Sequence, residues 1–362
     1  MPELFDPMTI RELTARNRVW VSPMCQYSVH ARDGVPRDWH LAHLGSFAVG
    51  GAGVVFAEAT AVSPEGRISY ADTGIWGDEH TAAWRPIVSF MHEQGAAAGI
   101  QLAHAGRKGS TWPAWGADGL NGTVPSDAGG WRPVAPSAIA FPDPSFAVPD
   151  ALEKAGIDSV VDDFAAAARR SVAAGFDVIE VHAAHGYLLH EFLSPLSNAR
   201  TDEYGGSLAN RARLLLRVVA AVREEIGDGM PLLVRFSASD YVEGGWDREQ
   251  TATVAGWARD AGADLFDISS GGNVTGVHIP LGPGYQVPFA AYVRRTAGVP
   301  VAAVGLITTP QQAAEIVSSG EADVVMLARA LLRDPHFALR AAHELGFGLD
   351  YWPPQYERAR WR

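Results

Sequence analysis

Short apolar runs rich in β-branched residues recur along the chain and alternate with longer segments that have the period of a helix. Eight of these runs have the length and composition of buried strands, at residues 18–23, 53–60, 98–106, 177–186, 231–240, 264–272, 300–308 and 323–330. Helical periodicity occupies residues 156–175, 207–227, 246–262 and 308–320. Strands that alternate with helices in this way indicate parallel βα units.

Eight βα units are the number that closes a (β/α)₈ TIM barrel, and the chain has a suitable length. The rival is an open, doubly wound sheet that binds a dinucleotide, but no G-x-G-x-x-G follows the first strand, and "GGAGVVF" lacks the spacing. We therefore expect one barrel domain over residues 1–345. Its segment 107–155, rich in Trp, Pro and Gly, is expected to form an ordered lid inserted after the third strand. Residues 346–362 would form a C-terminal tail, whose composition alone also fits a frayed end.

Composition narrows the possible partners. The 362 residues are 47% hydrophobic and carry a net charge of −12, which argues against nucleic acid or an anionic membrane surface as a partner. The first residues lack the apolar core of a signal peptide, so we expect a cytoplasmic, soluble protein. A single cysteine, Cys25, excludes an internal disulfide and a cysteine-held iron–sulfur cluster.

Unusual residues, many of them polar, lie where the predicted strands end, which is where TIM barrels build their active sites. They are Ser22, Pro23, Met24, Cys25 and Tyr27 after the first strand, Gln101 on the third, His182, His185 and Tyr187 on the fourth, Arg235 on the fifth, Gly305 on the seventh, and Ala328 and Arg329 on the eighth. Donors spread over so many strands favour a large, flat, hydrogen-bonding ligand over a compact metal ion.

The seventh and eighth loops of such barrels often hold a phosphate, which favours this role for Gly305, Ala328 and Arg329. Alternatively, Gly305 only eases a turn and Arg329 pairs with a carboxylate. Arg235 could likewise form a structural ion pair, and Gln101 could satisfy barrel backbone.

The histidines need separate interpretations. His182 and His185 lie three residues apart, as some metal ligands do, but zinc needs three or four protein ligands and the neighbouring strand ends offer Gln, Arg and Gly. No metal is therefore expected. His190 and Glu191 are assigned structural roles, and His30, His40, His43 and His80, which show no partner pattern, are interpreted as surface or loop residues.

Several motifs together resemble the old yellow enzyme family. They are "SPMCQY", "QLAHAGR", "HAAHGYLLHEFLSPLSNARTDEYGGSLANR", "RFSASD", "AVGLI" and "LARALLRDP", which cover nearly the whole chain. Within this family the chain resembles the bacterial subgroup of NADPH dehydrogenases and xenobiotic reductases, at Cys25, Tyr27 and the ending "QYER".

The resemblance implies non-covalent FMN across the barrel mouth. Ser22, Pro23, Met24, Cys25 and Ala59 would line one edge of the flavin, Gln101 and Arg235 would contact its pyrimidine side, and Gly305, Ala328 and Arg329 would hold its phosphate. Position 328 is usually glycine in the family, so alanine there is tolerated only if the residue does not need a positive φ.

The resemblance also implies an ene-reductase reaction. NADPH or NADH would reduce the flavin and leave, and an enone, enal, nitroalkene or quinone would take its place in ping-pong order. His182 and His185 would bind the substrate oxygen, Tyr187 would give the proton, and Tyr27 would contact the substrate, as would Arg358 from a neighbouring subunit of a homodimer or dimer of dimers.

Two alternatives stay open at this point. One is a non-catalytic barrel that binds flavin or phenols. The other is a different FMN-dependent barrel oxidoreductase, of which the dienoyl-CoA reductase type is disfavoured because it needs an iron–sulfur cluster and extra domains.

Overall fold

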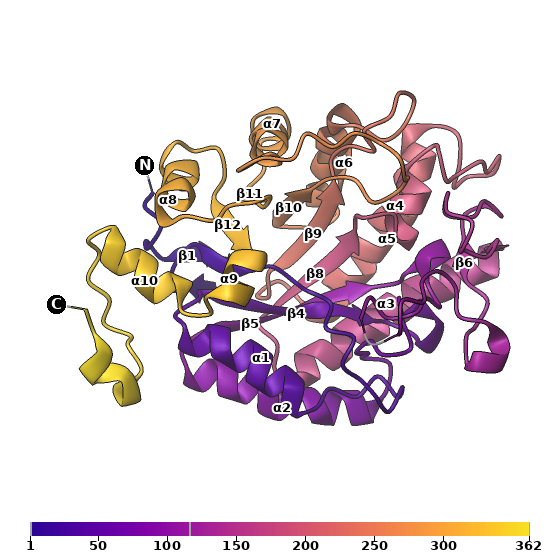
Figure 1. Cartoon of the computed structure of the whole chain (residues 1–362). Helices are drawn as coiled ribbons and strands as arrows, with labels where there is room; N and C mark the ends of the chain where they lie inside the picture. Colours follow the sequence, from indigo (N-terminus) through magenta and orange to yellow (C-terminus); the bar gives the residue numbers. More distant parts are fainter. Residues whose placement is uncertain (1, 116, 362) are drawn as a thin grey trace.

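The computed structural model describes residues 2–115 and 117–361. All eight expected strands are present and close into one parallel barrel in the order β10-β11-β12-β3-β4-β5-β8-β9 (Figure 1). Their bounds are β3 Val19–Val21, β4 Val54–Ala61, β5 Ala97–Ala103, β8 Val178–Ala183, β9 Leu232–Ser237, β10 Leu265–Ser269, β11 Val301–Ala303 and β12 Val324–Leu327. The predicted (β/α)₈ TIM barrel is confirmed.

Helices surround the barrel, and their ends follow local sequence signals (Figure 1). The long ones are α1 Asp38–Val49, α2 Asp78–Glu93, α3 Lys154–Ala174, α5 Leu208–Ile226, α6 Arg248–Asp260, α7 Val287–Ala297 and α8 Pro310–Ser318, and the shorter ones are α4 Leu188–Leu193, α9 Arg329–Arg333 and α10 Phe337–Glu344. Ser207 caps α5 and Thr309 caps α8, each accepting a backbone hydrogen bond with its side chain. No helix in the described part of the chain is long and apolar enough to cross a membrane.

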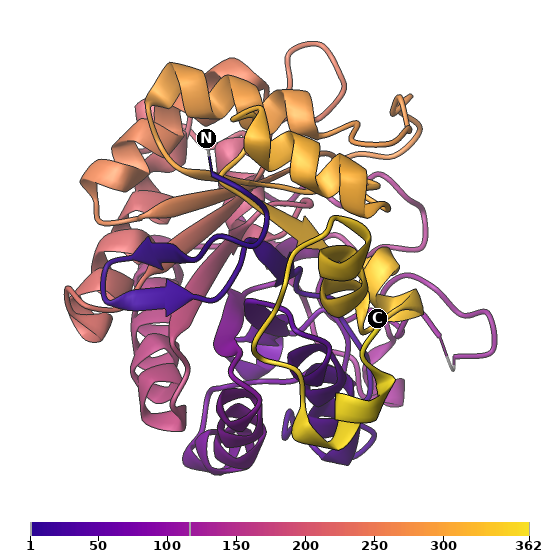
Figure 2. The same ribbon diagram turned by 90° about the vertical axis from the view of Figure 1, so that its left-hand side faces the viewer.

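The amino end of the barrel is filled with apolar side chains. One buried cluster takes a residue from seven of the eight strands, including Trp20, Phe56, Val178, Leu233 and Leu265, and Ala97 of β5 packs against it. Strands β1 (Met8–Ile10) and β2 (Leu13–Ala15) form a hairpin across this end (Figure 2), so it is closed to solvent.

The segment 107–155 packs over the opposite, carboxyl end with little regular structure. It holds a 3₁₀ turn at Ser126–Ala128 and the paired short strands β6 (Val134–Ala135) and β7 (Asp150–Ala151). Its tryptophans are held from below: Trp112 packs edge-on against Tyr70, Trp115 lies 4.9 Å from the Tyr27 ring, and the indole of Trp131 donates to the Glu65 carbonyl oxygen.

The C-terminal tail is attached at the amino end of the barrel, away from that segment (Figure 1). The Tyr351 hydroxyl accepts a 3.0 Å hydrogen bond from Asn17, and the Arg16 guanidinium lies 4.5 Å above the tyrosine ring. Beyond this anchor a short 3₁₀ helix, Pro354–Ala359, is exposed, and Arg358 with it.

Candidate active site

A sharp turn after β8 brings together the three residues on which the sequence prediction centred. His185 has φ 59° and Gly186 has φ 72°, so two successive residues are left-handed. A Cβ on Gly186 would lie 2.4 Å from the carbonyl oxygen of Gly272, so only glycine fits there. As a result the His182 ring lies 5.1 Å from the rings of both His185 and Tyr187, edge to face.

The two imidazoles are neutral hydrogen-bonding groups. The Ala184 backbone N–H donates to His182 Nδ1 at 3.3 Å, which leaves the proton on Nε2. His185 Nε2 lies 2.8 Å from the Ser269 hydroxyl, which also receives a hydrogen bond from Gln286. Burial, followed by the charge of Arg235, lowers the pKa of both histidines well below the usual value. Each therefore can donate one N–H without carrying a charge at neutral pH.

Tyr187 and Cys25 both keep their protons. Together with Tyr27 they pack against a small apolar cluster that contains Ala59 and Ala103. Burial, and next the nearby Cys25, raises the pKa of Tyr187 well above 10. Burial, followed by the carboxylates of Asp72 and Glu58, raises the pKa of the Cys25 thiol, so the thiolate is disfavoured. The Tyr187 phenol is therefore protonated and packs against apolar side chains.

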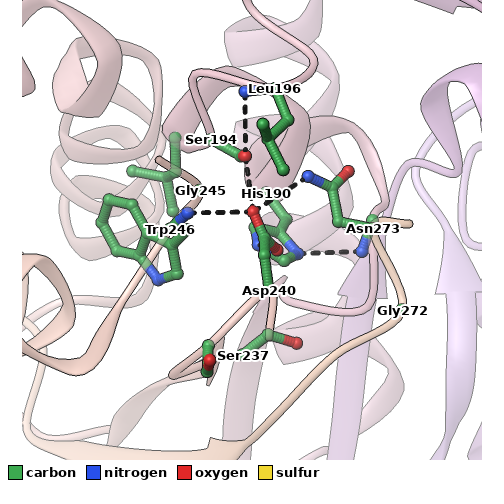
Figure 3. Close-up of polar contacts among 12 residues, drawn as sticks. His190, Ser194, Leu196, Ser237, Asp240, Gly245, Trp246, Gly272 and Asn273 are labelled. Atoms are coloured by element: carbon green, nitrogen blue, oxygen red, sulfur yellow. Dashed lines mark hydrogen bonds and ion pairs between the residues drawn. The ribbon is translucent and has the colours of Figure 1, made fainter. Parts of the chain in front are cut away.

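A buried polar network supports the turn from below, as Figure 3 shows. His190 Nδ1 accepts the backbone N–H of Gly186 at 2.9 Å, and its Nε2 lies 3.1 Å from Asp240. The Asp240 carboxylate also accepts hydrogen bonds from the Ser194 hydroxyl and the Trp246 backbone. Although burial opposes ionisation, His190 and these hydrogen bonds lower the pKa of Asp240 to about 2. His190 contacts the backbone of the turn rather than the pocket.

Sequence reasoning missed the basic pair Arg107–Lys108. The Lys108 ammonium donates to the carbonyl oxygens of His185 and Gly272, at 2.8 and 2.9 Å, and lies 5.0 Å from the Tyr187 ring centroid. Burial lowers its pKa to about 8. Arg107 donates to both oxygens of Asn273. The signal was available, because the pair follows the carboxyl end of β5 directly.

On the far side of the barrel mouth, Arg235, Gly305, Ala328 and Arg329 line a cavity of about 220 Å³, together with Ser22 and His185. No carboxylate in the described ranges lies within ion-pair distance of Arg329, whose side chain is exposed. The structure therefore does not provide the ion pair that was the alternative role for this arginine.

Two residues of this cavity differ in their backbone conformation. Gly305 has φ 107°, and a Cβ there would lie 2.7 Å from the Gln286 side chain, so glycine is favoured at this turn. Ala328 has a negative φ of −115°, so this position does not need the left-handed conformation that favours glycine. The departure from glycine at position 328 therefore leaves the loop intact.

Below the cavity, inward-facing polar side chains form a layer across the barrel. Arg235 Nε lies 2.9 Å from Asp267, and Gln101 donates to Glu180 at 2.7 Å. Arg235 thus forms the ion pair considered as its alternative role, but its two terminal nitrogens have no hydrogen-bond partner among the described residues and it lines the cavity. Gln101 contacts a side chain instead of barrel backbone.

The other predicted residues are distributed unevenly. Pro23, Met24, Cys25 and Tyr27 are half-buried between β3 and the lid segment, and Tyr27 also lines a hollow of about 1080 Å³ with Tyr70 and Trp115. Arg358 lies far from this site, on the tail at the other end of the chain's own barrel.

The interpretation of three histidines was wrong. His40 is buried and lies 3.3 Å from Glu58, and His80 is buried with both ring nitrogens in contact with backbone, at Gly77 and Asp33. His43 is half-buried, and burial, followed by His40, lowers its pKa to about 4. All three lie on helices. His40 and His80 each also contact a residue of a distant segment, Glu58 and Asp33 respectively, and no local pattern predicts these contacts. His30 is exposed, as expected.

Comparisons with known proteins agree with this geometry. The family model described as "NADH:flavin oxidoreductase / NADH oxidase family" matches residues 3–346. The chain is 47% identical to an NADPH dehydrogenase of Listeria innocua, covering 99% of each chain, and 48% identical to one of Geobacillus thermodenitrificans, covering 99% of this chain and 98% of the relative.

Solved structures show the same fold. The old yellow enzyme homologue of Zymomonas mobilis superposes with a TM-score of 0.80 at 29% identity, over 99% of this chain and 98% of that one. Morphinone reductase superposes with a TM-score of 0.78 at 29% identity, over 98% of this chain and 92% of that one.

Proposed function

Because the chain belongs to the NADH:flavin oxidoreductase / NADH oxidase family, and is thus an FMN-dependent oxidoreductase of the old yellow enzyme type, we propose that it is an ene-reductase. It would use NAD(P)H to reduce activated C=C bonds of α,β-unsaturated carbonyl or nitro compounds. One observation carries the proposal: two neutral imidazoles and a protonated phenol lie around one point beside a cavity suited to a flavin phosphate.

The residues of the site fit FMN. Arg235 on β9 has terminal donors available for the pyrimidine side, and Gln101 on β5, held by Glu180, would contact the same side. Gly305, Ala328 and Arg329 would hold the phosphate, because they combine backbone N–H groups with a guanidinium that faces the same cavity. Ser22, Pro23, Met24, Cys25 and Ala59 would line the remaining edge of the ring.

Bound FMN supplies a two-electron carrier that accepts a hydride from NAD(P)H and later passes it to the substrate. The nicotinamide and the alkene would occupy the same place in turn, which is ping-pong order. His182 and His185 would donate hydrogen bonds to the substrate's carbonyl or nitro oxygen, where negative charge develops as the hydride is added. Their neutrality suits this task, since a neutral donor stabilises the oxygen without protonating it.

Tyr187 would act as the general acid and give its proton to the α-carbon. Its raised pKa keeps that proton in place until the carbon becomes basic. Lys108 fixes the turn that carries both His185 and Tyr187, so we assign it a positioning role. Tyr27 would contact the substrate at the mouth, where Trp115 packs against it.

The tail supports a second part of the proposal. The resemblance to the family implies that the tail arginine, Arg358, enters the pocket of a neighbouring subunit in a homodimer or dimer of dimers, and its exposure on the 3₁₀ helix Pro354–Ala359 is compatible with this role.

Rapid-mixing absorbance tests the main proposal. Purified protein loaded with FMN is reduced by NADPH and then mixed anaerobically with cyclohexenone. We expect the reduced flavin to be reoxidised by the enone in a second, substrate-dependent phase. Protein that stays colourless with added FMN would refute flavin binding, and a reduced flavin that no enone, maleimide, nitroalkene or quinone reoxidises would indicate a barrel that only binds flavin or phenols.

A further inference from the structure

The polar layer inside the barrel contains more acidic groups than its single cation can neutralise. Glu180 on β8 and Asp267 on β10 are both fully buried, and Arg235 on β9 is the guanidinium they share. The strand register places Arg235 directly beside Asp267, while Glu180 lies beside Gln101 of β5. Asp267 thus has the ion pair, and Glu180 has only a neutral amide.

The hydrogen bonds of Glu180 show where a proton can be held. One carboxyl oxygen accepts the Gln101 amide at 2.7 Å, and the other is buried without a partner among the described residues. A buried, ionised carboxylate with one neutral donor is costly, and binding a proton on the second oxygen removes that cost.

The charged groups around Glu180 act in opposite directions. Burial and the carboxylate of Asp267 raise the pKa of Glu180 to about 8, and Arg235 opposes them. Gln101 of β5 is uncharged, and His182, the next inward-facing residue on β8, is neutral at this pH because burial lowers its pKa. Burial is the largest of these influences and is fixed by the fold, whereas the Arg235 charge is the one that a ligand beside Arg235 can change.

We propose that Glu180 is a positioning residue that acts through Gln101 and Arg235, and that in alkaline solution its carboxyl binds a proton when the flavin beside Arg235 becomes more negative. This inference rests on the proposed function, because it needs FMN at Arg235 and Gln101. At neutral pH Glu180 already carries its proton and is uncharged, so it does not compete with the cofactor for the positive charge of Arg235. In alkaline solution Glu180 is ionised while the flavin is oxidised.

Electrons and protons balance as follows in that alkaline range. NADPH transfers a hydride, which is two electrons and one hydrogen, to the flavin and leaves as NADP⁺. The added negative charge interacts with Arg235, so Arg235 stabilises the ionised form of Glu180 less. One proton from solvent then forms an O–H bond on the second carboxyl oxygen of Glu180, the one that Gln101 does not contact. The protein therefore takes up one proton with the two electrons, in addition to the hydrogen of the hydride.

The midpoint potential of the bound flavin, measured against pH, tests this. On the acid side of about pH 8 the wild type and Glu180→Gln should have parallel curves. On the alkaline side the wild type should take up as much as one more proton per two electrons than Glu180→Gln, so its curve becomes steeper. Glu191→Gln is the matched control: Glu191 is equally buried and burial raises its pKa to about 8, but its contacts are with the Arg107 turn. It should behave as wild type.

A second measurement uses wild-type protein alone, in case the Glu180→Gln substitution prevents folding. Infrared difference spectra of reduction above about pH 8 should show a protonated carboxylic acid appearing, with the expected shift in D₂O. That signal should persist in Glu191→Gln. Parallel potential curves or no such signal, in protein that binds FMN and is reduced by NADPH, would overturn the role of Glu180 alone. Failure to bind FMN would overturn both this inference and the proposed function.

Discussion

The two ends of the barrel interior are built from the same strands but differ completely in chemistry. On β8 the inward-facing side chains are Val178, Glu180 and His182, and on β10 they are Leu265, Asp267 and Ser269. Every second residue faces inward, so each of these two strands passes from an apolar level through a charged level to a hydrogen-bonding level. The apolar level sits under the β1–β2 hairpin, and the hydrogen-bonding level sits under the lid segment.

Along a single strand, the residues at the amino end stabilise the fold and those at the carboxyl end form the candidate site. At the amino end, close packing of apolar groups stabilises the fold. At the carboxyl end, buried polar groups lack part of their partners, which costs stability but leaves donors free for a ligand. Substitutions at the two ends should therefore have opposite signatures.

The largest effect is expected at the carboxyl end, from Tyr187→Phe. Loss of the general acid should slow reoxidation of the reduced flavin by cyclohexenone by about 10²- to 10⁴-fold. Reduction by NADPH should be unchanged, because no proton from this residue is needed there. Stopped-flow absorbance measures both half-reactions separately. Tyr27→Phe, a tyrosine of the same cluster, serves as the control and should slow reoxidation far less. Equal reoxidation rates in wild type and Tyr187→Phe would refute the assigned role.

The next effect compares two positions on β10. Leu265→Ala should lower the free energy of unfolding by about 2–5 kcal/mol, because it leaves a cavity in the apolar level. The folded fraction should still bind FMN. Ser269→Ala, four residues further along β10, should lower the free energy of unfolding by about 1 kcal/mol or less. It should nevertheless weaken the binding of a substrate analogue, because His185 loses its hydrogen-bond partner. Denaturant unfolding measures the free energy of unfolding, and ligand titration measures the affinity. If both substitutions changed stability and affinity in the same proportion, the two ends of the barrel would not differ in role.

How much of this organisation is predictable from the sequence depends on the distance between partners. The strands were found because apolar β-branched runs are local signals, and Ser207 and Thr309 mark helix starts for the same reason. The predicted fourth strand ran to residue 186, but β8 ends at Ala183 because His185 and Gly186 adopt positive φ. Recognising that turn requires Gly272, which lies far along the chain.

The charged level was missed for a related reason. Asp267 and Glu180 look like ordinary polar positions in apolar runs until the register of neighbouring strands is known. His40 was misread because its partner, Glu58, lies on a different element. Residues that face the pocket were predictable by resemblance, whereas those that hold them required the barrel itself.

A smaller effect is expected from Arg329→Ala, which tests whether this arginine at the carboxyl end binds the FMN phosphate. Loss of one charged hydrogen-bonding group costs about 1.5–3 kcal/mol, so the Kd for FMN should rise by roughly 10- to 150-fold. Riboflavin, which lacks the phosphate, is the matched ligand control, and its Kd should not change. Fluorescence quenching on reconstitution measures both. A parallel loss of FMN and riboflavin affinity would contradict phosphate binding by this arginine.

The smallest effect is expected from the tail, at a position that neither end of the chain's own barrel contacts. Arg358→Ala should raise the KM for cyclohexenone by roughly five- to tenfold, as expected for the loss of one ordinary hydrogen bond worth about 1–1.4 kcal/mol, without changing the rate of flavin reduction. Arg360→Ala is the control, since Arg360 pairs with Glu357 on the same exposed helix. Both variants should elute as oligomers in size-exclusion chromatography. A monomeric wild type, or an identical KM in all three proteins, would mean that each barrel completes its site alone.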